Sequence, residues 1–259
     1  MVRVAIVAAG LLLAAATSAS AAEHPFPRLP RECARSDFTS EGSRVRAALC
    51  LPSGTGRVPA AIVLHGCGGF DTFDHRLAVD LPHAGIATFY IDYFDPTPPP
   101  GNKGFCSGDR GSGRNVFAVW EQEVVDAVTH LRGEPRVDSS RLALLGWSLG
   151  GGVAVAAASA DHEAFKALVG FSTGFFAAPS RDLATVPPTL LLSGGPRDAI
   201  PLSVTEALYR ALRSAGVPAE LYDYGHGVHS WPGAQGTAGI AVAETFLRRT
   251  LLPRTTAVH

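Results

Sequence analysis

The sequence Gly146-Trp147-Ser148-Leu149-Gly150 lies between two contrasting segments of the chain. Residues 141–145 before it are apolar and of strand type, whereas residues 151–158 after it are small and favour a tightly packed helix. At a strand-to-helix turn, Gly-x-Ser-x-Gly places a serine hydroxyl above the sheet, and the two glycines leave room for the turn. The pattern makes Ser148 a candidate nucleophile. The alternative is a glycine-rich turn that only packs a helix on a strand.

Apolar strand-like segments alternate with helical segments along the rest of the chain. Strands are expected at 45–51, 60–64, 88–94, 141–145, 167–171, 189–193 and 220–224. Helices are expected at 74–84, 116–132, 151–158, 203–216 and 237–252, with Ser203 and Glu206 as a capping box. Buried parallel strands appear as apolar runs, so the pattern predicts an α/β fold with a mostly parallel sheet and helices on both faces. Active sites of such sheets lie at the carboxyl ends of the strands.

The first residues have the features of a secretory signal peptide. A positive start at Arg3 precedes an apolar segment at 4–16, and small residues follow it. The segment is shorter than the roughly 20 residues that span a bilayer, although an uncleaved membrane anchor is the alternative. We therefore expect a signal peptide at 1–22 and one α/β domain at 23–259, in the periplasm or outside the cell.

Composition narrows the classes of partner. The formal net charge is −1, 46% of the residues are hydrophobic and 17% are charged, which argues against a disordered chain. The sequence has no basic cluster to indicate nucleic acid and no Cys-x-x-Cys motif to indicate a redox or zinc site. We expect a small-molecule substrate, no cofactor or metal, no membrane contact after signal cleavage, and a monomer by default.

Four cysteines follow the predicted signal peptide, at 33, 50, 67 and 106. An even number in an exported chain indicates disulfides, and three sets of pairs are possible. We favour Cys33–Cys50, which would join the N-terminal segment to the first long strand. That pair leaves Cys67–Cys106, which would connect the loops after two successive strands. Free buried thiols are the alternative.

A serine nucleophile needs a base and an acid that orients the base, in the chain order Ser, Asp or Glu, His. His226 and His229 both follow the last predicted strand, and we prefer His229 because a glycine-flanked turn precedes it. A metal pair formed by these two histidines is a further alternative. Asp198 directly follows the strand at 189–193 and is the predicted acid, with Asp223 as a rival.

The loop at 65–69, His-Gly-Cys-Gly-Gly, follows the strand at 60–64 and suits an oxyanion hole. The backbone N–H of Leu149 is one predicted donor, and that of Cys67 or Gly68 is the second. His65 is expected to support this loop by hydrogen bonding rather than to act as a base.

Aromatic residues stand close to the predicted site in sequence. Tyr93, Trp147 and Trp231 are candidate substrate-binding residues, and Phe94 is a further candidate wall. The alternative for each of them is an ordinary position in the core.

Taken together, the loop at 65–69, the turn at 146–151, Asp198 and the segment His229-Ser230-Trp231 resemble the dienelactone hydrolase family of α/β-hydrolases over roughly residues 40–252. The resemblance implies an eight-stranded sheet and hydrolysis of small esters or lactones. The hydrolases that name the family use a cysteine nucleophile, whereas position 148 is serine, so a broader carboxylesterase is expected.

The resulting hypothesis is an exported serine hydrolase that cleaves small esters or lactones through an acyl-enzyme on Ser148. Two other classes stay open. One is a peptidase-like hydrolase of the same fold, and the other is a non-catalytic exported binding protein on this scaffold.

Overall fold

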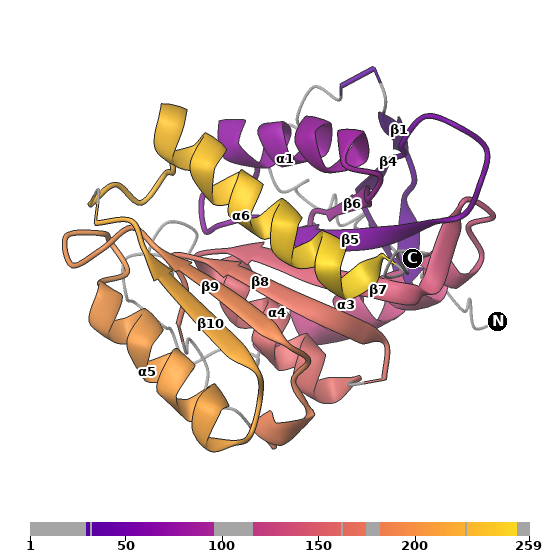
Figure 1. The fold of residues 1–259 in the computed structure, drawn as a ribbon. Coiled ribbons are helices and arrows are strands. Elements are labelled where there is room, and N and C mark those ends of the chain that lie inside the picture. The colour runs from indigo at the N-terminus through magenta and orange to yellow at the C-terminus, as the bar shows by residue number, and fades with distance from the viewer. Residues whose placement is uncertain are drawn as a thin grey trace, which may run out of the picture.

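A computed structural model of the chain describes residues 30–31, 33–95, 116–161, 163–174, 182–225 and 227–252. Within these residues an eight-stranded sheet forms the centre of the molecule (Figure 1). Its strands, in spatial order, are β1 (Cys33–Arg35), β4 (Ala47–Cys50), β6 (Ala87–Ile91), β5 (Val58–Leu64), β7 (Val137–Trp147), β8 (Phe165–Phe171), β9 (Thr189–Ser193) and β10 (Ala219–Asp223). β4 runs antiparallel to β1 and β6, and all pairs from β6 to β10 are parallel. The predicted α/β class with a mostly parallel sheet is confirmed.

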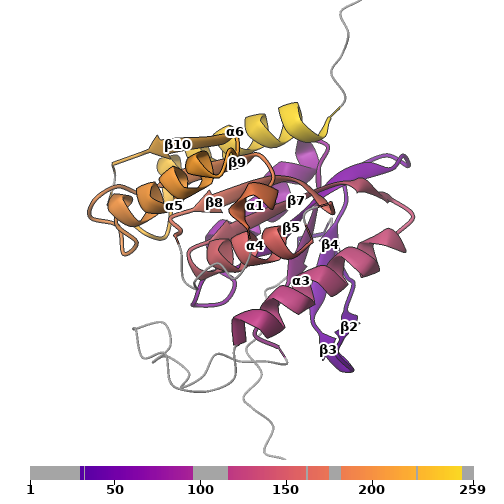
Figure 2. The same cartoon turned by 90° about the horizontal axis from the view of Figure 1, so that it is seen from below.

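Helices cover both faces of the sheet (Figures 1 and 2). α1 (Thr72–His83) and α6 (Gly233–Leu251) pack on one face, and α3 (Val116–Arg132), α4 (Leu149–Ala160) and α5 (Leu202–Ser214) pack on the other. β5 illustrates the cause, because Ile62 and Leu64 face α3 and α4 while Ala61 and Val63 face α1 and α6. Alternate side chains of a strand point to opposite faces, so an unbroken apolar run supplies two cores at once.

Several predicted boundaries are corrected by the structure. The strand expected at 45–51 is divided, because β3 (Ser43–Val45) pairs with β2 (Phe38–Ser40) in a separate hairpin and β4 begins at Ala47. Arg46 stands between them with its side chain buried, and it pairs with Asp92 at 2.7 Å and Asp95 at 2.8 Å. These ion pairs stabilise the buried charge of Arg46 within residues 45–51, a segment whose sequence otherwise predicts one continuous strand.

The predicted capping box of the fourth helix is wrong. α5 begins after Pro201, which makes no side-chain cap, and Glu206 pairs on the surface with Arg210. A capping box is found instead at α1, where Asp71 and Asp74 exchange side-chain and backbone hydrogen bonds. That box starts α1 at Thr72, two residues before the predicted start.

The predicted Cys33–Cys50 disulfide is present. It joins residues that face each other across the antiparallel pair of β1 and β4, and so fixes an edge strand to the sheet. Cys67 is also disulfide-bonded. Its predicted partner, Cys106, lies outside the described residues.

We expect a Cys33→Ala, Cys50→Ala double variant to lose about 3 kcal/mol of unfolding free energy, because the bridge closes a loop with a sequence separation of 17 and restricts the unfolded chain. Urea denaturation followed by circular dichroism measures the change. Identical denaturation midpoints for the variant and the parent protein would contradict this expectation.

Glu123 is a buried carboxyl group on α3, and its Oε2 has no hydrogen-bond partner within the described residues. Burial, reinforced by the negative charges of Asp92 and Asp95, raises the pKa of Glu123 to about 9. Between the usual pKa of a glutamate side chain and pH 9, Glu123 therefore stays protonated in the folded protein, whereas it loses its proton in the unfolded chain.

Stability should accordingly fall as the pH rises from about 5 to 9, by at most about 1.4 kcal/mol per pH unit from this group. In Glu123→Gln the side chain is neutral at every pH, so most of this decline should disappear. Urea denaturation of both proteins at a series of pH values checks the prediction, which fails if the two pH profiles are parallel.

Candidate active site

Ser148 stands in a strained turn between β7 and α4. Its backbone has φ 53° and ψ −119°, and its side chain is largely buried. A Cβ added at Gly146 would lie 2.4 Å from the backbone carbon of Gly150, and one added at Gly150 would lie 2.2 Å from the Leu64 oxygen. The glycines are therefore required because the turn packs against its own helix and against the end of β5. Thr173 stabilises the turn, because its Oγ1 donates a hydrogen bond to the backbone carbonyl oxygen of Ser148 at 2.8 Å.

The structure brings Ser148, Asp198 and His229 into one hydrogen-bonded chain. The Nε2 atom of His229 lies 2.9 Å from Ser148 Oγ, and its Nδ1 atom lies 2.6 Å from Asp198 Oδ1. A carboxylate only accepts hydrogen bonds, so Nδ1 carries the hydrogen and Nε2 can accept one from the serine. The three residues follow β7, β9 and β10, and they meet at the carboxyl ends of these parallel strands.

Asp198 is buried, with an exposed fraction of 4%. Besides His229, it receives hydrogen bonds from Ser172 Oγ at 2.6 Å and from the Ile200 N–H at 2.8 Å. Burial by itself would raise the pKa of Asp198. The hydrogen bonds from His229, Ser172 and Ile200, in that order, hold this pKa below its usual value. The carboxylate thus stays ionised beside the imidazole.

Asp223 and His226 are the alternative candidates for the acid and the base. Asp223 Oδ1 accepts a hydrogen bond from the Gly225 N–H at 2.9 Å, so this side chain closes the turn after β10. His226 lies outside the described residues. Within the described residues, no group of three or more His, Cys, Asp or Glu side chains could hold a metal ion.

The loop after β5 is held in place by several hydrogen bonds. The Gly69 N–H donates to the Gly66 oxygen at 3.1 Å, and His65 Nδ1 donates to the same oxygen at 2.7 Å. Tyr93 donates from its hydroxyl to the His65 oxygen at 2.6 Å. Leu149 is the first residue of α4, so its N–H lies outside the ladder of that helix. The oxyanion role of Leu149 with Cys67 or Gly68 stays a prediction.

The three candidate substrate-binding aromatics differ in position. Trp147 borders the site, because its Nε1 donates to the His229 oxygen at 2.9 Å and its ring centroid lies 5.3 Å from the imidazole. Tyr93 and Trp231 have exposed fractions of 0% and 1%. As positioned here they support loops from within the core, which corrects the expectation that they form a pocket wall. Phe94 is also buried, and its ring packs against that of His65 in an edge-to-face contact.

Ser172 and Thr173 were missed in the sequence analysis. Both contact the site residues directly, and both are fully buried. They follow β8 at the carboxyl edge of the sheet, which is the signal that could have identified them.

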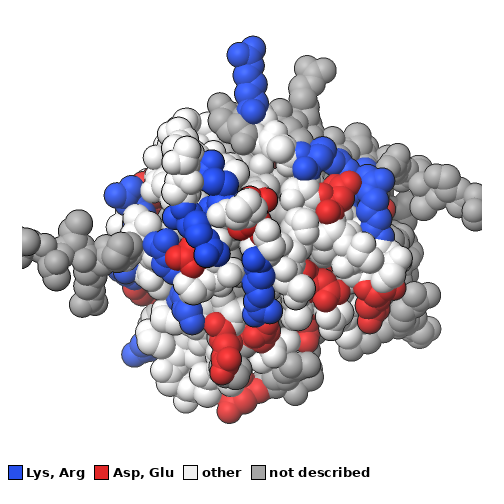
Figure 3. Space-filling view, turned by 90° about the vertical axis from the view of Figure 1, so that its right-hand side faces the viewer, with Lys and Arg blue, Asp and Glu red and all other residues white. Residues whose placement is uncertain are grey.

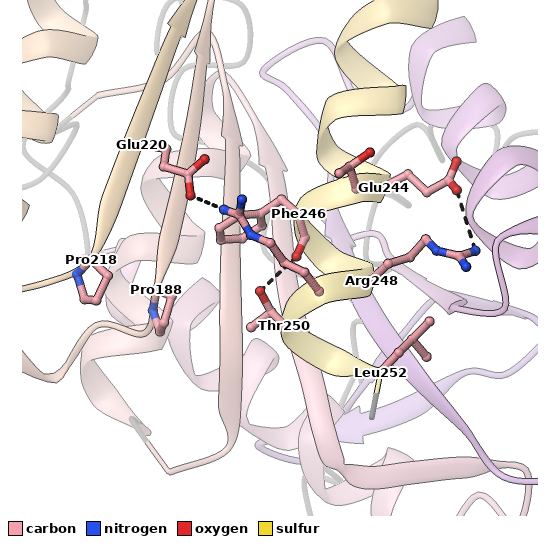
Figure 4. Close-up of a pocket in the computed structure, with 10 residues that line it drawn as sticks. Pro188, Pro218, Glu220, Glu244, Phe246, Arg248, Thr250 and Leu252 are labelled. Carbon is pink, nitrogen blue, oxygen red and sulfur yellow. Dashed lines mark hydrogen bonds and ion pairs between the residues drawn. The ribbon is translucent and has the colours of Figure 1, made fainter. Parts of the chain in front are cut away.

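A hollow lies at the other end of the sheet. Figure 4 shows it between α6 and the starts of β9 and β10, where Pro188 and Pro218 directly precede the strands. Two ion pairs border it, Arg249 with Glu220 and Arg248 with Glu244. Figure 3, which views the molecule from the right-hand side of Figure 1, shows positive and negative side chains interspersed on that face. Ser148 follows β7 at the opposite edge, so this hollow is separate from the candidate active site.

Residues 45–244 match the family model described as "Dienelactone hydrolase family". The chain belongs to the dienelactone hydrolase family. The predicted family is confirmed. No helix within the described residues is long and apolar enough to cross a membrane.

Two curated relatives of this dienelactone hydrolase family member are named as a lactonase and a thioesterase. One is a "probable 2-oxo-3-(5-oxofuran-2-ylidene)propanoate lactonase" of Bradyrhizobium sp, 32% identical over 52% of this chain and 54% of that protein. The other is the mitochondrial acyl-coenzyme A thioesterase 2 of Mus musculus, 29% identical over 73% of this chain and 41% of that protein. The chain thus spans about half or less of the length of these relatives.

Solved structures share the fold at low sequence identity. A dienelactone hydrolase-like promiscuous phosphotriesterase from metagenomic libraries has a TM-score of 0.72 and 18% identity, and covers 84% of this chain and 98% of that one. A thermostable esterase of Pseudomonas putida has a TM-score of 0.69 and 20% identity, over 86% and 84% of the two chains. At these identities the likeness concerns the fold alone.

Proposed function

We propose that this protein is an exported serine hydrolase that cleaves small carboxylic esters or lactones through an acyl-enzyme on Ser148. The observation that carries the proposal is the unbroken hydrogen-bonded chain from Asp198 through His229 to Ser148 Oγ. A serine hydroxyl is a weak nucleophile at neutral pH, and an adjacent base with an orienting acid is what activates it. A scaffold that only binds a ligand has no use for such a chain.

In the first half-reaction, Ser148 Oγ forms a bond to the ester carbonyl carbon as its proton passes to His229 Nε2. The carbonyl π electrons move to oxygen, and the oxyanion accepts hydrogen bonds from the N–H of Leu149 and that of Cys67 or Gly68. When the C–O bond to the alcohol breaks, the leaving oxygen takes the proton from His229. The acyl group remains on Ser148 as an ester.

In the second half-reaction, a water molecule takes the place of the alcohol. His229 removes a proton from the water as its oxygen attacks the acyl carbon, and the proton then returns to Ser148 Oγ as the acid leaves. Asp198 holds the imidazole in the tautomer with hydrogen on Nδ1 and stabilises the imidazolium that forms in each half. For a lactone, the hydroxyl freed in the first step remains part of the acyl chain, so the second step releases a single hydroxy acid.

The substrate class follows from chemistry at two levels. The family is named for a lactone hydrolase, and the two relatives are named as a lactonase and a thioesterase. All three names describe hydrolysis at an acyl group. Serine at position 148, where the hydrolases that name the family have cysteine, favours ordinary esters and lactones over the dienelactone itself. Export is supported by the predicted signal peptide at 1–22 and by the Cys33–Cys50 disulfide, since disulfides persist in oxidising compartments.

A fluorophosphonate probe followed by peptide mass spectrometry tests the proposal on the mature protein. We expect labelling at Ser148 and turnover of p-nitrophenyl acetate or butyrate in a panel of short and aromatic esters. Labelling with cleavage of acyl-peptide substrates, but of no ester, would favour a peptidase-like hydrolase, and an acylaminoacyl peptidase does share this fold at 17% identity. Absence of labelling in folded protein would favour a binding protein and would overturn the proposal.

A further inference from the structure

Ser172 is a fully buried residue one position beyond β8, and its hydroxyl group joins two parts of the site. Its Oγ lies 2.6 Å from Asp198 Oδ2 and 2.8 Å from Trp231 Nε1. Asp198 uses its other oxygen, Oδ1, for His229. Ser172 therefore contacts the carboxylate from the side that faces away from the imidazole.

The direction of these hydrogen bonds is fixed by chemistry. An indole N–H can only donate, so Trp231 donates to Ser172 Oγ. An ionised carboxylate can only accept, so the hydroxyl hydrogen of Ser172 points to Asp198. The result is an ordered path in which Trp231 orients Ser172 and Ser172 orients Asp198. Such paths strengthen each member, because every bond polarises the next.

The backbone at these positions is also unusual. Among the described residues four non-glycine residues have positive φ, and three belong to this network: Ser148 at 53°, Ser172 at 43° and Trp231 at 49°. The strain at Ser172 persists because its N–H is anchored to the Leu192 oxygen at 2.7 Å. Strained conformations of this kind are held by their surroundings and gather at functional sites.

Resting on the proposed function, we propose that Ser172 is a positioning residue for the hydrolysis, which acts through Asp198 and touches no reacting atom. By binding Oδ2, it prevents rotation of the carboxylate and keeps Oδ1 directed at His229 Nδ1. Together with His229 and the Ile200 N–H, it also takes a share of the negative charge of Asp198.

Ser172→Ala and Ser172→Gly test the proposal as a pair. Both remove the hydroxyl, but glycine also removes the backbone strain at positive φ. A loss that the two variants share therefore belongs to the hydroxyl. We expect kcat for a short p-nitrophenyl ester to fall about tenfold or more in both, with KM nearly unchanged, because the lost hydrogen bond is to a charged group.

The pH profile supplies a readout that a purely structural role would not move. Without Ser172 the negative charge of Asp198 is less shared, and the Asp198–His229 pair keeps a proton up to a higher pH. The acid limb of kcat/KM should therefore shift to higher pH in both variants. Trp231→Phe removes the indole N–H that donates to Ser172 but keeps an aromatic ring and the Ser172 hydroxyl, so its loss in kcat should be smaller.

Thr189→Val is the matched control, because Thr189 is a fully buried hydroxyl that donates to the Pro187 oxygen at the start of β9. It should lower stability and leave kcat and the pH profile unchanged. Wild-type kcat and pH dependence in both Ser172 variants, while Ser148→Ala is inactive, would overturn the role of Ser172 alone. Should Ser148→Ala keep its activity, the proposed function itself would fail.

Discussion

Replacing Ser148 with alanine should lower kcat/KM for a p-nitrophenyl ester by at least about 10⁴-fold. The variant loses the atom that forms the acyl-enzyme, so His229 has no hydroxyl group to activate. The fold should survive, since alanine is smaller and the surrounding backbone of β7 and α4 is unchanged. Initial rates at several substrate concentrations, with thermal unfolding measured in parallel, give both quantities.

Ser159→Ala provides the comparison for this variant. Ser159 lies near the end of α4, and its hydroxyl donates to the carbonyl oxygen of Ala156, one turn earlier in the helix. It should therefore retain parental kcat/KM after identical purification. Ester hydrolysis that persists in Ser148→Ala at more than a few per cent of the parental rate would mean that a different group is the nucleophile.

Gly150→Ala should be the most damaging single-methyl substitution in this region. The new Cβ would lie 2.2 Å from the Leu64 oxygen and 2.5 Å from the His65 oxygen, and both are backbone atoms that cannot rotate away. Helix propensity alone favours alanine by about 1 kcal/mol. The clash should outweigh that gain, because the end of β5 must move, and we expect a loss of about 3 kcal/mol or more in unfolding free energy.

Urea denaturation and ester hydrolysis of Gly150→Ala measure the two consequences, since the same displacement shifts the loop at 65–69 and the helix that carries Leu149. Gly56→Ala is the matched substitution, with no atom within 4 Å of the added Cβ. It should leave stability within about 0.5 kcal/mol of the parent. Parental stability in Gly150→Ala would contradict the packing described for the turn.

Much of the sheet could be predicted because each buried strand contributes to two cores. The sequence predicts β9 and α3 with their observed ends at 189–193 and 116–132, because β9 is an unbroken apolar run and α3 has apolar residues at helical spacing on one face. Prediction failed where side chains override the pattern. Arg46 interrupts the first predicted strand with buried ion pairs, and the first turn of α5 is capped by no side chain.

The candidate site was predictable to the extent that chemistry depends on residue type and chain order. Ser148, Asp198 and His229 follow strands in the order expected, and the structure places them in contact. The role of Ser172 was not predictable, and the choice between a pocket wall and a core position stayed open for Tyr93 and Trp231. Serine and aromatic residues are common, and only three-dimensional packing gives these ones a partner. Residue identity alone does not distinguish an aromatic wall from an aromatic support.

The position of β10 at the end of the sheet has a consequence for inactivation. This strand pairs with β9 alone within the described residues, and its last residues are exposed. His229 follows this strand, whereas Ser148 follows β7 near the middle of the sheet. Edge segments open at lower free energy than central ones. Heating or mild denaturant should therefore separate the imidazole from the serine first, so that turnover is lost before the spectroscopic signal of the helices changes.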